Sequence, residues 1–338
     1  MVALTIYDIA KEAGTSISTV SRVLNNKANV KPEVKKRVEE VLKKYNYKPS
    51  AIARGMVSKT MKSIAVLTVD VRVSHYARII YVIEQEFSRK GYNVTVCNIG
   101  NSARECARYI KILTEKQVDG IVLIGSVFSK IIDTEENIAL LKNTPVVMAN
   151  GSLPYDNFKS VMVDDRGTIR EITDYLFDKG YRNIYYVQDM DTPSANIKAD
   201  GFRESLKLHN IERVESRIIE TEYGLEGGRD AADKIIAMGR EFDAVVFGED
   251  ITAIGAMKQF IRRGFKVPGD VAVTGCNNCS ETRICEPELT TIDNKPELQG
   301  QMCAAILSDI LEGKKVENGL VIKAEIVERE SVKKLKML

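Results

Sequence analysis

Short apolar runs alternate with amphipathic stretches over most of this 338-residue chain. From residue 63 onward, runs such as Ile64–Val69, Gly120–Ile124 and Ala244–Phe247 have the length and composition of buried strands. Helical stretches, for example Tyr76–Arg89 and Ile251–Arg263, separate them. Strands joined by crossover helices pair in parallel. The pattern therefore predicts an α/β fold with two doubly wound parallel-sheet subdomains and a ligand cleft between them.

The second subdomain is predicted to begin with a strand at Val161–Asp164, which leads into a helix ending near Asp178. Late in the chain, Leu289–Ile292 and a helix over Glu297–Leu311 look like a return to the first subdomain. One final strand is expected over Val321–Glu328.

The N-terminal stretch Thr5–Asn25 has a different texture, that of two short helices joined by a tight turn. Thr5 is a good N-cap, and Gly14 can adopt the left-handed backbone that ends a helix. In the second helix Val20 and Val23 point inward, which leaves the polar positions outward. This layout is that of a DNA-binding helix-turn-helix, although an ordinary helical hairpin has the same spacing.

Charge separates this end from the rest of the chain. Residues 1–60 contain 12 Lys and Arg against 5 Asp and Glu, whereas the whole chain has a net charge of only +2. A basic module on a mildly acidic body suits phosphate binding at one end. No apolar run approaches the roughly 20 residues that span a bilayer, and the first residues do not resemble a signal peptide. We expect a cytoplasmic protein without membrane contact.

The cysteines favour no metal or cofactor. Cys276, Cys279 and Cys285 cluster in CNNCSETRIC, but a second Cys-x-x-Cys pair at matching spacing is absent from the sequence. The favoured interpretation is that these cysteines are small side chains buried in the core, with one thiol exposed. A metal or redox role is the alternative. The sequence has two histidines, which leaves little material for a histidine-based metal site or catalytic triad.

Several sequence pieces together resemble the lactose-repressor/galactose-repressor family of bacterial transcription factors. At the N-terminus they are Asp8-Ile9-Ala10, Ala13-Gly14 and Thr19-Val20-Ser21-Arg22-Val23-Leu24-Asn25. In the body they include Asp164-Asp165-Arg166-Gly167, Gly201-Phe202, Val267-Pro268-Gly269-Asp270 and Arg329-Glu330-Ser331. The resemblance therefore extends from about Thr5 to Ser331.

The resemblance implies three parts: a helix-turn-helix headpiece at 1–48, a hinge helix at 49–60 and an effector-binding and dimerisation domain at 61–338. Within the last part, the periplasmic-binding-protein-like subdomains would cover about 61–161 with 292–322, and about 162–291 with 323–338. At the DNA, the family's base-reading positions correspond to Ile17, Ser18 and Arg22. The resemblance also implies phosphate or hinge contacts for Tyr7, Thr19, Ser21, Asn25, Ala53 and Met56, the last wedging into the minor groove.

At the effector cleft this sequence departs from the family pattern. Lys198 stands where many sugar-binding members have Arg, Asn277 where they have Asp, Glu249 where they have Asn, and Asn150 where Asp is common. Tyr76 and Tyr223 would supply aromatic faces for a ring. A sugar-like polyol is the first expectation for the effector. A sugar phosphate, a nucleoside, a base, or control by a protein partner through a degenerate cleft are the alternatives.

The resemblance implies a repressor that binds a near-palindromic operator in double-stranded DNA as a homodimer. Residues 332–338 have no room for a leucine-heptad helix that would make a tetramer. A transport solute-binding protein would predict an export signal and no headpiece. An enzyme is disfavoured because the sequence has no dinucleotide fingerprint, phosphate loop or nucleophile elbow. Whether the effector is an inducer or a corepressor stays open.

Overall fold

The computed structural model describes residues 5–24, 30–47 and 60–334. The chain divides into two compact units, residues 1–63 and 64–338, and each is described by itself. Three residues expected to contact DNA, Asn25, Ala53 and Met56, lie outside the described residues. Across the described ranges, every helix is too short or too polar to cross a membrane.

The smaller unit contains the expected helix-turn-helix followed by a third helix: α1 (Ile6–Glu12), α2 (Ile17–Leu24) and α3 (Pro32–Lys44). Thr5 and Asp8 form a reciprocal capping box at the start of α1. Gly14 turns the chain with φ +59°, a backbone conformation that glycine adopts without strain. All three helices contribute to one small apolar core of Ile9, Ala10, Ala13, Val20, Val23 and Val38.

The first sheet of the larger unit has the strand order β11-β5-β4-β3-β1-β2. Its strands are β1 (Ser63–Thr68), β2 (Asn93–Asn98), β3 (Gly120–Ile124), β4 (Val146–Ala149), β5 (Phe158–Val163) and β11 (Leu320–Ile322). The registers of β1 with β3, β3 with β4, β4 with β5, and β5 with β11 are all parallel. The expected doubly wound arrangement is therefore present.

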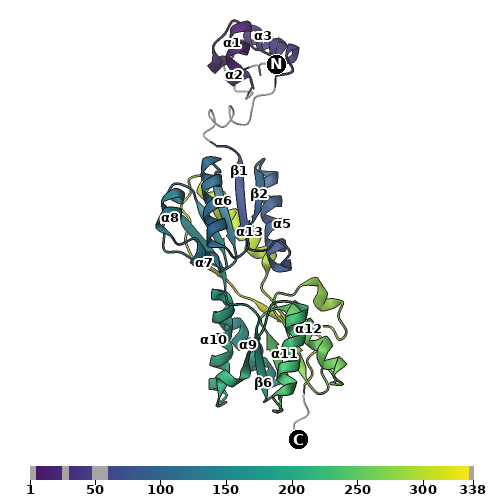
Figure 1. Ribbon diagram of the computed structural model, residues 1–338. Coiled ribbons are helices and arrows are strands. Elements are labelled where there is room, and N and C mark those ends of the chain that lie inside the picture. The colour runs from purple at the N-terminus through teal and green to yellow at the C-terminus, as the bar shows by residue number, and fades with distance from the viewer. Residues whose placement is uncertain (1–4, 25–29, 48–59, 335–338) are drawn as a thin grey trace. The chain divides into compact units, whose positions relative to one another are not determined.

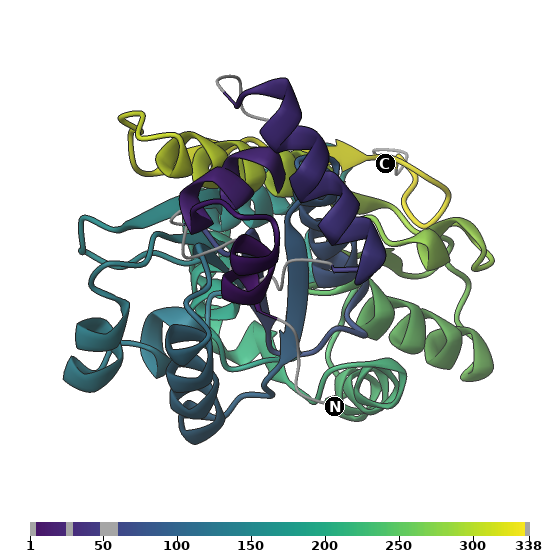
Figure 2. The same ribbon diagram turned by 90° about the horizontal axis from the view of Figure 1, so that it is seen from above.

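Side chains alternate across β1 and bury against two helical layers. Ile64 and Val66 pack with α5 (Ser74–Arg89) and α13 (Pro296–Leu311). Ala65 and Leu67 pack with the opposite layer, formed by α6 (Ala103–Glu115), α7 (Phe128–Ile131) and α8 (Glu135–Leu141). The layers are visible on either side of the sheet (Figure 1 and Figure 2).

The second sheet is also parallel, in the order β7-β6-β8-β9. Its strands are β6 (Ile184–Gln188), β7 (Ile218–Glu220), β8 (Ala244–Phe247) and β9 (Ala272–Thr274). Helices α9 (Asp165–Asp178) and α10 (Pro193–Leu208) cover one face, while α11 (Leu225–Ala237) and α12 (Asp250–Arg262) cover the other. Two short 3₁₀ helices, η1 (Val214–Arg217) and η2 (Ser280–Arg283), complete this half.

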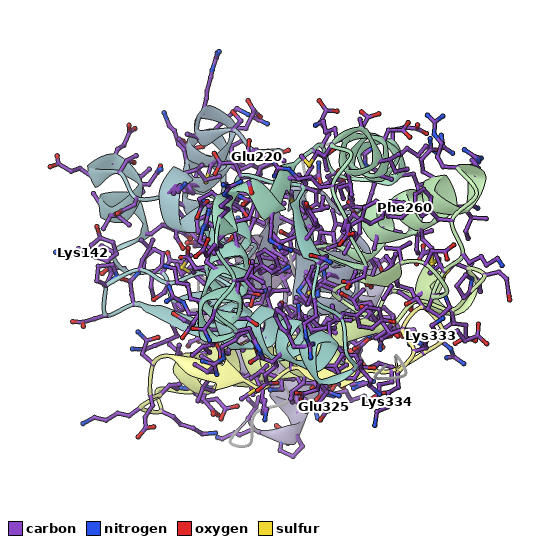
Figure 3. The ribbon with its side chains drawn as sticks, turned by 90° about the horizontal axis from the view of Figure 1, so that it is seen from below. Lys142, Glu220, Phe260, Glu325, Lys333 and Lys334 are labelled. Atoms are coloured by element: carbon purple, nitrogen blue, oxygen red, sulfur yellow. The ribbon has the colours of Figure 1, made fainter. Side chains whose placement is uncertain are left out.

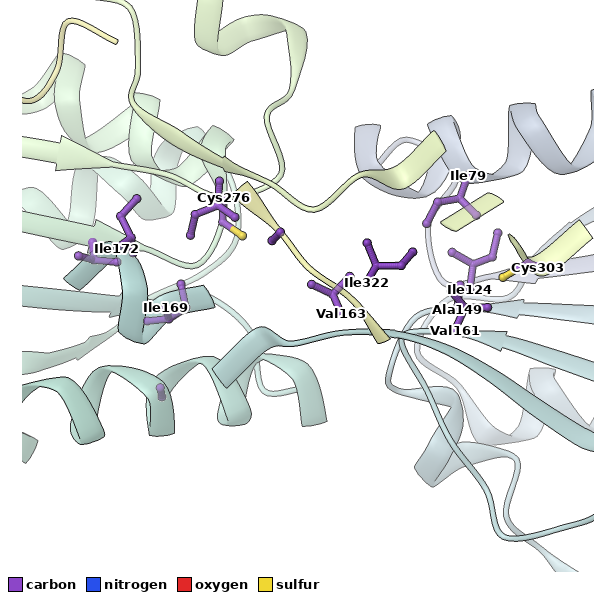
Figure 4. Close-up of a cluster of buried hydrophobic side chains, with 14 of the residues drawn as sticks. Ile79, Ile124, Ala149, Val161, Val163, Ile169, Ile172, Cys276, Cys303 and Ile322 are labelled. Atoms are coloured by element: carbon purple, nitrogen blue, oxygen red, sulfur yellow. The ribbon is translucent and has the colours of Figure 1, made fainter. Parts of the chain in front are cut away.

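Crossing segments join the two sheets. Strands β10 (Thr291–Asp293) and β12 (Glu325–Val327) form an antiparallel pair between them. Figure 4 shows Val163 and Ile322, the last residues of β5 and β11, between Ile169 and Ile172 on one side and Ile124 and Val161 on the other. One apolar core therefore runs from the first sheet into the second. Charged side chains such as Lys142 and Lys333 lie at the periphery (Figure 3).

Two strand predictions were wrong. The strand expected at Val161–Asp164 is β5, which pairs with β4 and β11 in the first sheet rather than opening the second. The single strand expected over Val321–Glu328 is two strands, because β11 pairs with β5 and β12 pairs with β10. Apolar periodicity identifies a strand but not its partner, so it cannot assign a crossing segment to a sheet.

Candidate DNA interface and effector cleft

The predicted DNA-contacting side chains that the structure describes lie on α1 and α2 of the smaller unit. Tyr7 on α1 is 68% exposed, and Ile17 at the start of α2 is 39% exposed, although both are large and partly apolar. Ser18 and Arg22 on α2 are also exposed, whereas Thr19 and Ser21 are half-buried.

The local sequence explains this exposure. Ser16 precedes α2, and its Oγ accepts a hydrogen bond from the Thr19 amide at 3.2 Å, which caps the helix. Val20 and Val23 are buried on the opposite side of α2. An outward Arg beside Ile and Ser presents a guanidinium fork, an apolar surface and a hydroxyl, which are the groups that read base edges in the major groove.

In the larger unit, polar residues gather where parallel strands end. Ser126 follows β3, Asn150 follows β4, Asp189 follows β6 and Glu249 follows β8. These side chains line one pocket together with residues of α5, α9 and α10. Five of the six predicted effector residues line it, namely Tyr76, Asn150, Lys198, Glu249 and Asn277. Tyr223 does not line it but lines a neighbouring hollow, where it is 40% exposed.

Lys198 anchors a chain of hydrogen bonds through this pocket. Its buried Nζ donates to the Gly248 carbonyl at 2.9 Å and lies 3.4 Å from Glu249 Oε1. Glu249 Oε2 accepts from Asn277 Nδ2 at 2.6 Å. Burial disfavours the ammonium, but neighbouring acidic groups, Glu249 and Asp165 among them, raise the pKa of Lys198 well above its usual value. Lys198 therefore carries its charge in the pocket.

Two further carboxyl groups face the same space. Asp165, in the first turn of α9, accepts from Ser194 Oγ at 2.6 Å. Asp189 accepts from the Thr252 hydroxyl. Burial raises the pKa of Asp165, and burial together with the Glu249 charge raises the pKa of Asp189 to about 7. Burial also raises the pKa of Glu249.

Four buried polar atoms that line the pocket have no hydrogen-bond partner in the structure. They are His75 Nδ1, Asn150 Oδ1, Tyr186 Oη and Asn294 Oδ1. Burial lowers the pKa of His75 to about 3, so its ring is neutral. An unsatisfied buried polar atom costs about 1–3 kcal/mol. A bound molecule with several hydroxyl or amine groups would satisfy these atoms.

Backbone geometry explains why asparagine occupies two of the positions. Asn150 has φ +59° and Asn277 has φ +99°, both in the left-handed region. Asparagine tolerates such backbone conformations better than most residues. Strained residues of this kind cluster at binding sites, where the surrounding structure holds them in place.

Two groups of contacts cross between the subdomains. The Ser194 amide at the start of α10 donates to Ser126 Oγ at 3.1 Å. Arg78 on α5 donates from Nη1 to the carbonyl oxygens of Asn277 and Asn278, at 3.3 Å and 3.0 Å. The same guanidinium forms two hydrogen bonds with Glu297 in the first turn of α13. These contacts hold the walls of the cleft together.

Sequence reasoning missed several lining residues: His75, Ser126, Asp165, Tyr186, Asp189, Ser194 and Asn294. Asp165 and Asp189 carried a usable signal, because each is the first or second residue after a strand whose carboxyl end faces the cleft. Tyr186 lies within a strand, so nothing in the local pattern distinguishes it from a core tyrosine.

The cysteines form no disulfides, and Cys276 and Cys279 are buried. Burial raises the pKa of the Cys276 thiol to about 12, which keeps it protonated. Within the described residues, no three His, Cys, Asp or Glu side chains are grouped to hold a metal ion.

Two family profiles match the chain. One, described as bacterial regulatory proteins of the lacI family, matches residues 5–50, and one, described as a periplasmic binding protein-like domain, matches residues 173–332. An HTH-type transcriptional regulator of Lachnoclostridium phytofermentans is 30% identical over 97% of this chain and 99% of its own. The HTH-type transcriptional repressor PurR of Pectobacterium carotovorum is 31% identical over 97% of this chain and 96% of its own.

A solved structure shares the fold. The lac repressor dimer bound to operator and the anti-inducer ONPF matches with a TM-score of 0.83 at 23% identity, over 97% of this chain and 98% of that one.

Proposed function

Because this chain belongs to the lacI family of bacterial regulatory proteins, we propose that it binds a near-palindromic operator as a homodimer and is controlled by a sugar-like molecule in its cleft. At the coarser level it is a DNA-binding transcriptional repressor of that family and not an enzyme. The finer proposal concerns the operator, the assembly and the effector.

The observation that carries the effector proposal is the group of unpartnered polar atoms in a buried, strand-end pocket. Four such atoms converge there with Lys198 and three carboxyl groups. Polar groups in a protein interior are normally satisfied, so a cluster of exceptions is best explained by a missing partner. A polyol offers both donors and acceptors at close spacing, and Tyr76 lines the pocket with an aromatic ring for its apolar side.

On the DNA side, we assign base reading to Ile17, Ser18 and Arg22, and phosphate contacts to Tyr7, Thr19 and Ser21. The exposure of Tyr7, Ile17 and Arg22 supports this assignment. Their apolar and charged side chains are accessible to solvent and therefore available to contact DNA. Asn25, Ala53 and Met56 keep their proposed roles on sequence grounds alone.

The proposed mechanism is a coupling between cleft and headpiece. A ligand that binds one arrangement of the two subdomains more tightly shifts the protein toward that arrangement. The typical size of such a coupling is about 1–3 kcal/mol. The dimeric state is proposed by similarity to the lac repressor dimer bound to operator.

Fluorescence anisotropy on an inverted-repeat operator, selected from a randomised DNA pool, tests the proposal at fixed salt. Fixed salt is needed because phosphate contacts make affinity salt-dependent. A sugar panel is then titrated into the protein–DNA complex. A shift in operator affinity of about tenfold or more by one sugar supports the proposal, and its sign distinguishes an inducer from a corepressor.

The alternative within the same fold is control by a non-sugar ligand or a protein partner. The observation that favours it is the presence of Lys198, Glu249 and Asn277 where the family resemblance leads us to expect other side chains. Sequence-selective operator binding that no sugar changes would support this alternative. Absence of sequence-selective binding would contradict the proposed function as a whole.

A further inference from the structure

Carboxyl groups outnumber cationic side chains in the lining of the cleft. Asp165, Asp189 and Glu249 face it, and Lys198 is the only cationic side chain among the described lining residues, since His75 is neutral. Lys198 lies beside Glu249 and donates its second bond to a backbone carbonyl. The side-chain hydrogen-bond partners of Asp165 and Asp189 are the hydroxyls of Ser194 and Thr252. The cleft thus holds two carboxyl groups with no side-chain cation bonded to them.

A second hollow beside the cleft is also lined mainly by carboxyl groups among its charged residues. It shares Asp189 and Met190 with the cleft and is also lined by Asp191, Asp200, Glu220 and Glu222. Glu220 is among the residues labelled in Figure 3. Arg203 is the only cationic lining residue among those described, and its guanidinium is already bonded to Glu215 and Asp200. The hollow next to the cleft is therefore strongly acidic.

An acidic cluster alone does not identify a ligand site, but independent evidence marks this one. His75 Nδ1 and Tyr186 Oη line the same cleft and have no partner, and both residues are more than nine-tenths buried. These atoms require a hydrogen-bonding occupant whatever its charge. The excess of carboxyl groups then favours a cationic ligand over a neutral or anionic one.

We propose that the effector is a small polyol that carries a protonated amine, such as an amino sugar, with its ammonium held by Asp165 and Asp189. This inference rests on the proposed function, since it assigns the chemical class of the molecule that the cleft is proposed to bind. A buried ammonium requires a paired carboxylate, and a carboxylate–ammonium hydrogen bond is among the stronger ones in proteins.

The same charges argue against a sugar phosphate. A phosphate would meet three carboxyl groups and a single ammonium that is already bonded. Like charges at short range in a poorly hydrated site are costly. A neutral sugar could satisfy the orphaned atoms but would leave Asp165 and Asp189 without a cationic partner.

Two matched ligand sets test the charge preference on the full-length protein at pH 7. The first is glucosamine, N-acetylglucosamine and glucose 6-phosphate, and the second is 1-amino-1-deoxysorbitol, sorbitol and sorbitol 6-phosphate. Isothermal titration calorimetry measures each affinity. At least one amine is expected to bind about tenfold or more tightly than its neutral and phosphorylated counterparts. Equal or tighter binding of a neutral or phosphorylated compound, or no binding of either amine at millimolar concentration, overturns the proposal.

Charge-neutralising variants locate the preference. Asp189→Asn and Asp165→Asn are expected to reduce the ratio of amine to neutral affinity by about tenfold, since each removes one proposed partner of the ammonium. Asp230→Asn, which neutralises an exposed carboxylate on α11, is the control and should leave the ratio unchanged. Folding of each variant is checked by its melting curve. An unchanged ratio in two folded variants contradicts the assignment of the ammonium site.

Operator-binding anisotropy on the same samples distinguishes failure of the amine preference from failure of the proposed function. Retained sequence-selective binding that responds to a neutral sugar, but not to an amine, overturns only the charge preference. Loss of sequence-selective binding in the unmodified protein overturns the proposed function itself.

Discussion

Arg22 is the exposed arginine on α2, with buried Val20 and Val23 behind it. A guanidinium in that position can form a two-pronged bond with guanine. Arg22→Ala is expected to cost about 1–3 kcal/mol of operator binding and to relax specificity at one base pair. Competition anisotropy against operators carrying each base at that position measures both effects.

Arg22→Lys provides the matched control, because lysine keeps the charge but not the planar fork. Its non-specific DNA affinity and salt dependence should stay close to those of the unmodified protein, while base discrimination falls. If the lysine variant kept full discrimination, Arg22 would act through the phosphates instead.

Asp189 should make the binding of an amine ligand pH-dependent. Asp189 lies near the charged groups of Lys198 and Glu249. Its own charge contributes to raising the pKa values of Tyr186 and Tyr223. Burial raises its pKa to about 7 in the free protein, so it loses its proton mainly above that pH. Only the ionised form attracts an ammonium. Affinity for 1-amino-1-deoxysorbitol should therefore fall as pH decreases from 8 to 5, by up to about tenfold per pH unit below 7.

Calorimetry at several pH values checks this, and buffers of different ionisation enthalpy detect the proton released on binding. Asp189→Asn should flatten the profile. A profile that remains steep in that variant would assign the titration to another group in the cleft, such as Asp165 or Glu249.

Single residues also show what the sequence could and could not supply. Asn150, Lys198, Glu249 and Asn277 were predicted from their places in recognisable segments, and the structure brings them into one pocket. Tyr223 was predicted in the same way but lines the neighbouring hollow. The burial that raises the pKa of Asp189 arises from tertiary packing, which no local pattern contains. The charge excess in the cleft was therefore not predictable.

The pairing of α11 with α12 depends on small residues at the contact. A Cβ placed on Gly255 would lie 2.2 Å from the Leu225 carbonyl oxygen, and neither atom belongs to a flexible side chain. Gly255→Ala should therefore force the two helices apart and lower the free energy of unfolding by about 1–3 kcal/mol or more. Urea denaturation followed by circular dichroism measures this.

Lys258→Ala is the control for that substitution, since Lys258 is exposed on the same helix. It should change stability by less than about 0.5 kcal/mol. A Gly255→Ala variant as stable as this control would mean that the helices separate at little cost.

Elements differ in how far their own sequence determines them. The helix-turn-helix was predictable, because its caps, turn glycine and inward valines lie within 20 residues of one another and form their own core. Strands β5 and β11 were not assigned correctly, because they pair with each other although they lie far apart in the sequence. Their assignment to the first sheet depends on that pairing and not on their composition.

At the scale of the whole molecule, the two parallel sheets were predictable from the alternation of strands and helices. The contacts that connect the sheets across the cleft were not, since they join residues about 70 to 200 positions apart. Arg78 is the clearest case. Its sequence context is an ordinary amphipathic helix, yet its guanidinium bonds Glu297 and two backbone carbonyls of the loop after β9.

Arg78 should set how strongly ligand binding is coupled to DNA binding. Its bonds to Asn277 and Asn278 join α5, on the first sheet, to a loop that also lines the cleft. Removing them with Arg78→Ala favours separation of the subdomains, so a ligand that needs both walls must first restore the closed arrangement. Ligand affinity should fall by about three- to tenfold, and the ligand-induced change in operator affinity should shrink.

Arg89→Ala is the matched control for this test, because Arg89 lies on the same helix and bonds only Glu86 on that helix in the contacts seen here. Calorimetry for the ligand and anisotropy for the operator should leave this control unchanged. If Arg78→Ala altered melting temperature but not ligand affinity, its bonds would serve stability alone. Weaker ligand binding with an unaltered melting temperature would instead place Arg78 in the connection between the subdomains, since only the closed arrangement presents both walls of the cleft to the ligand.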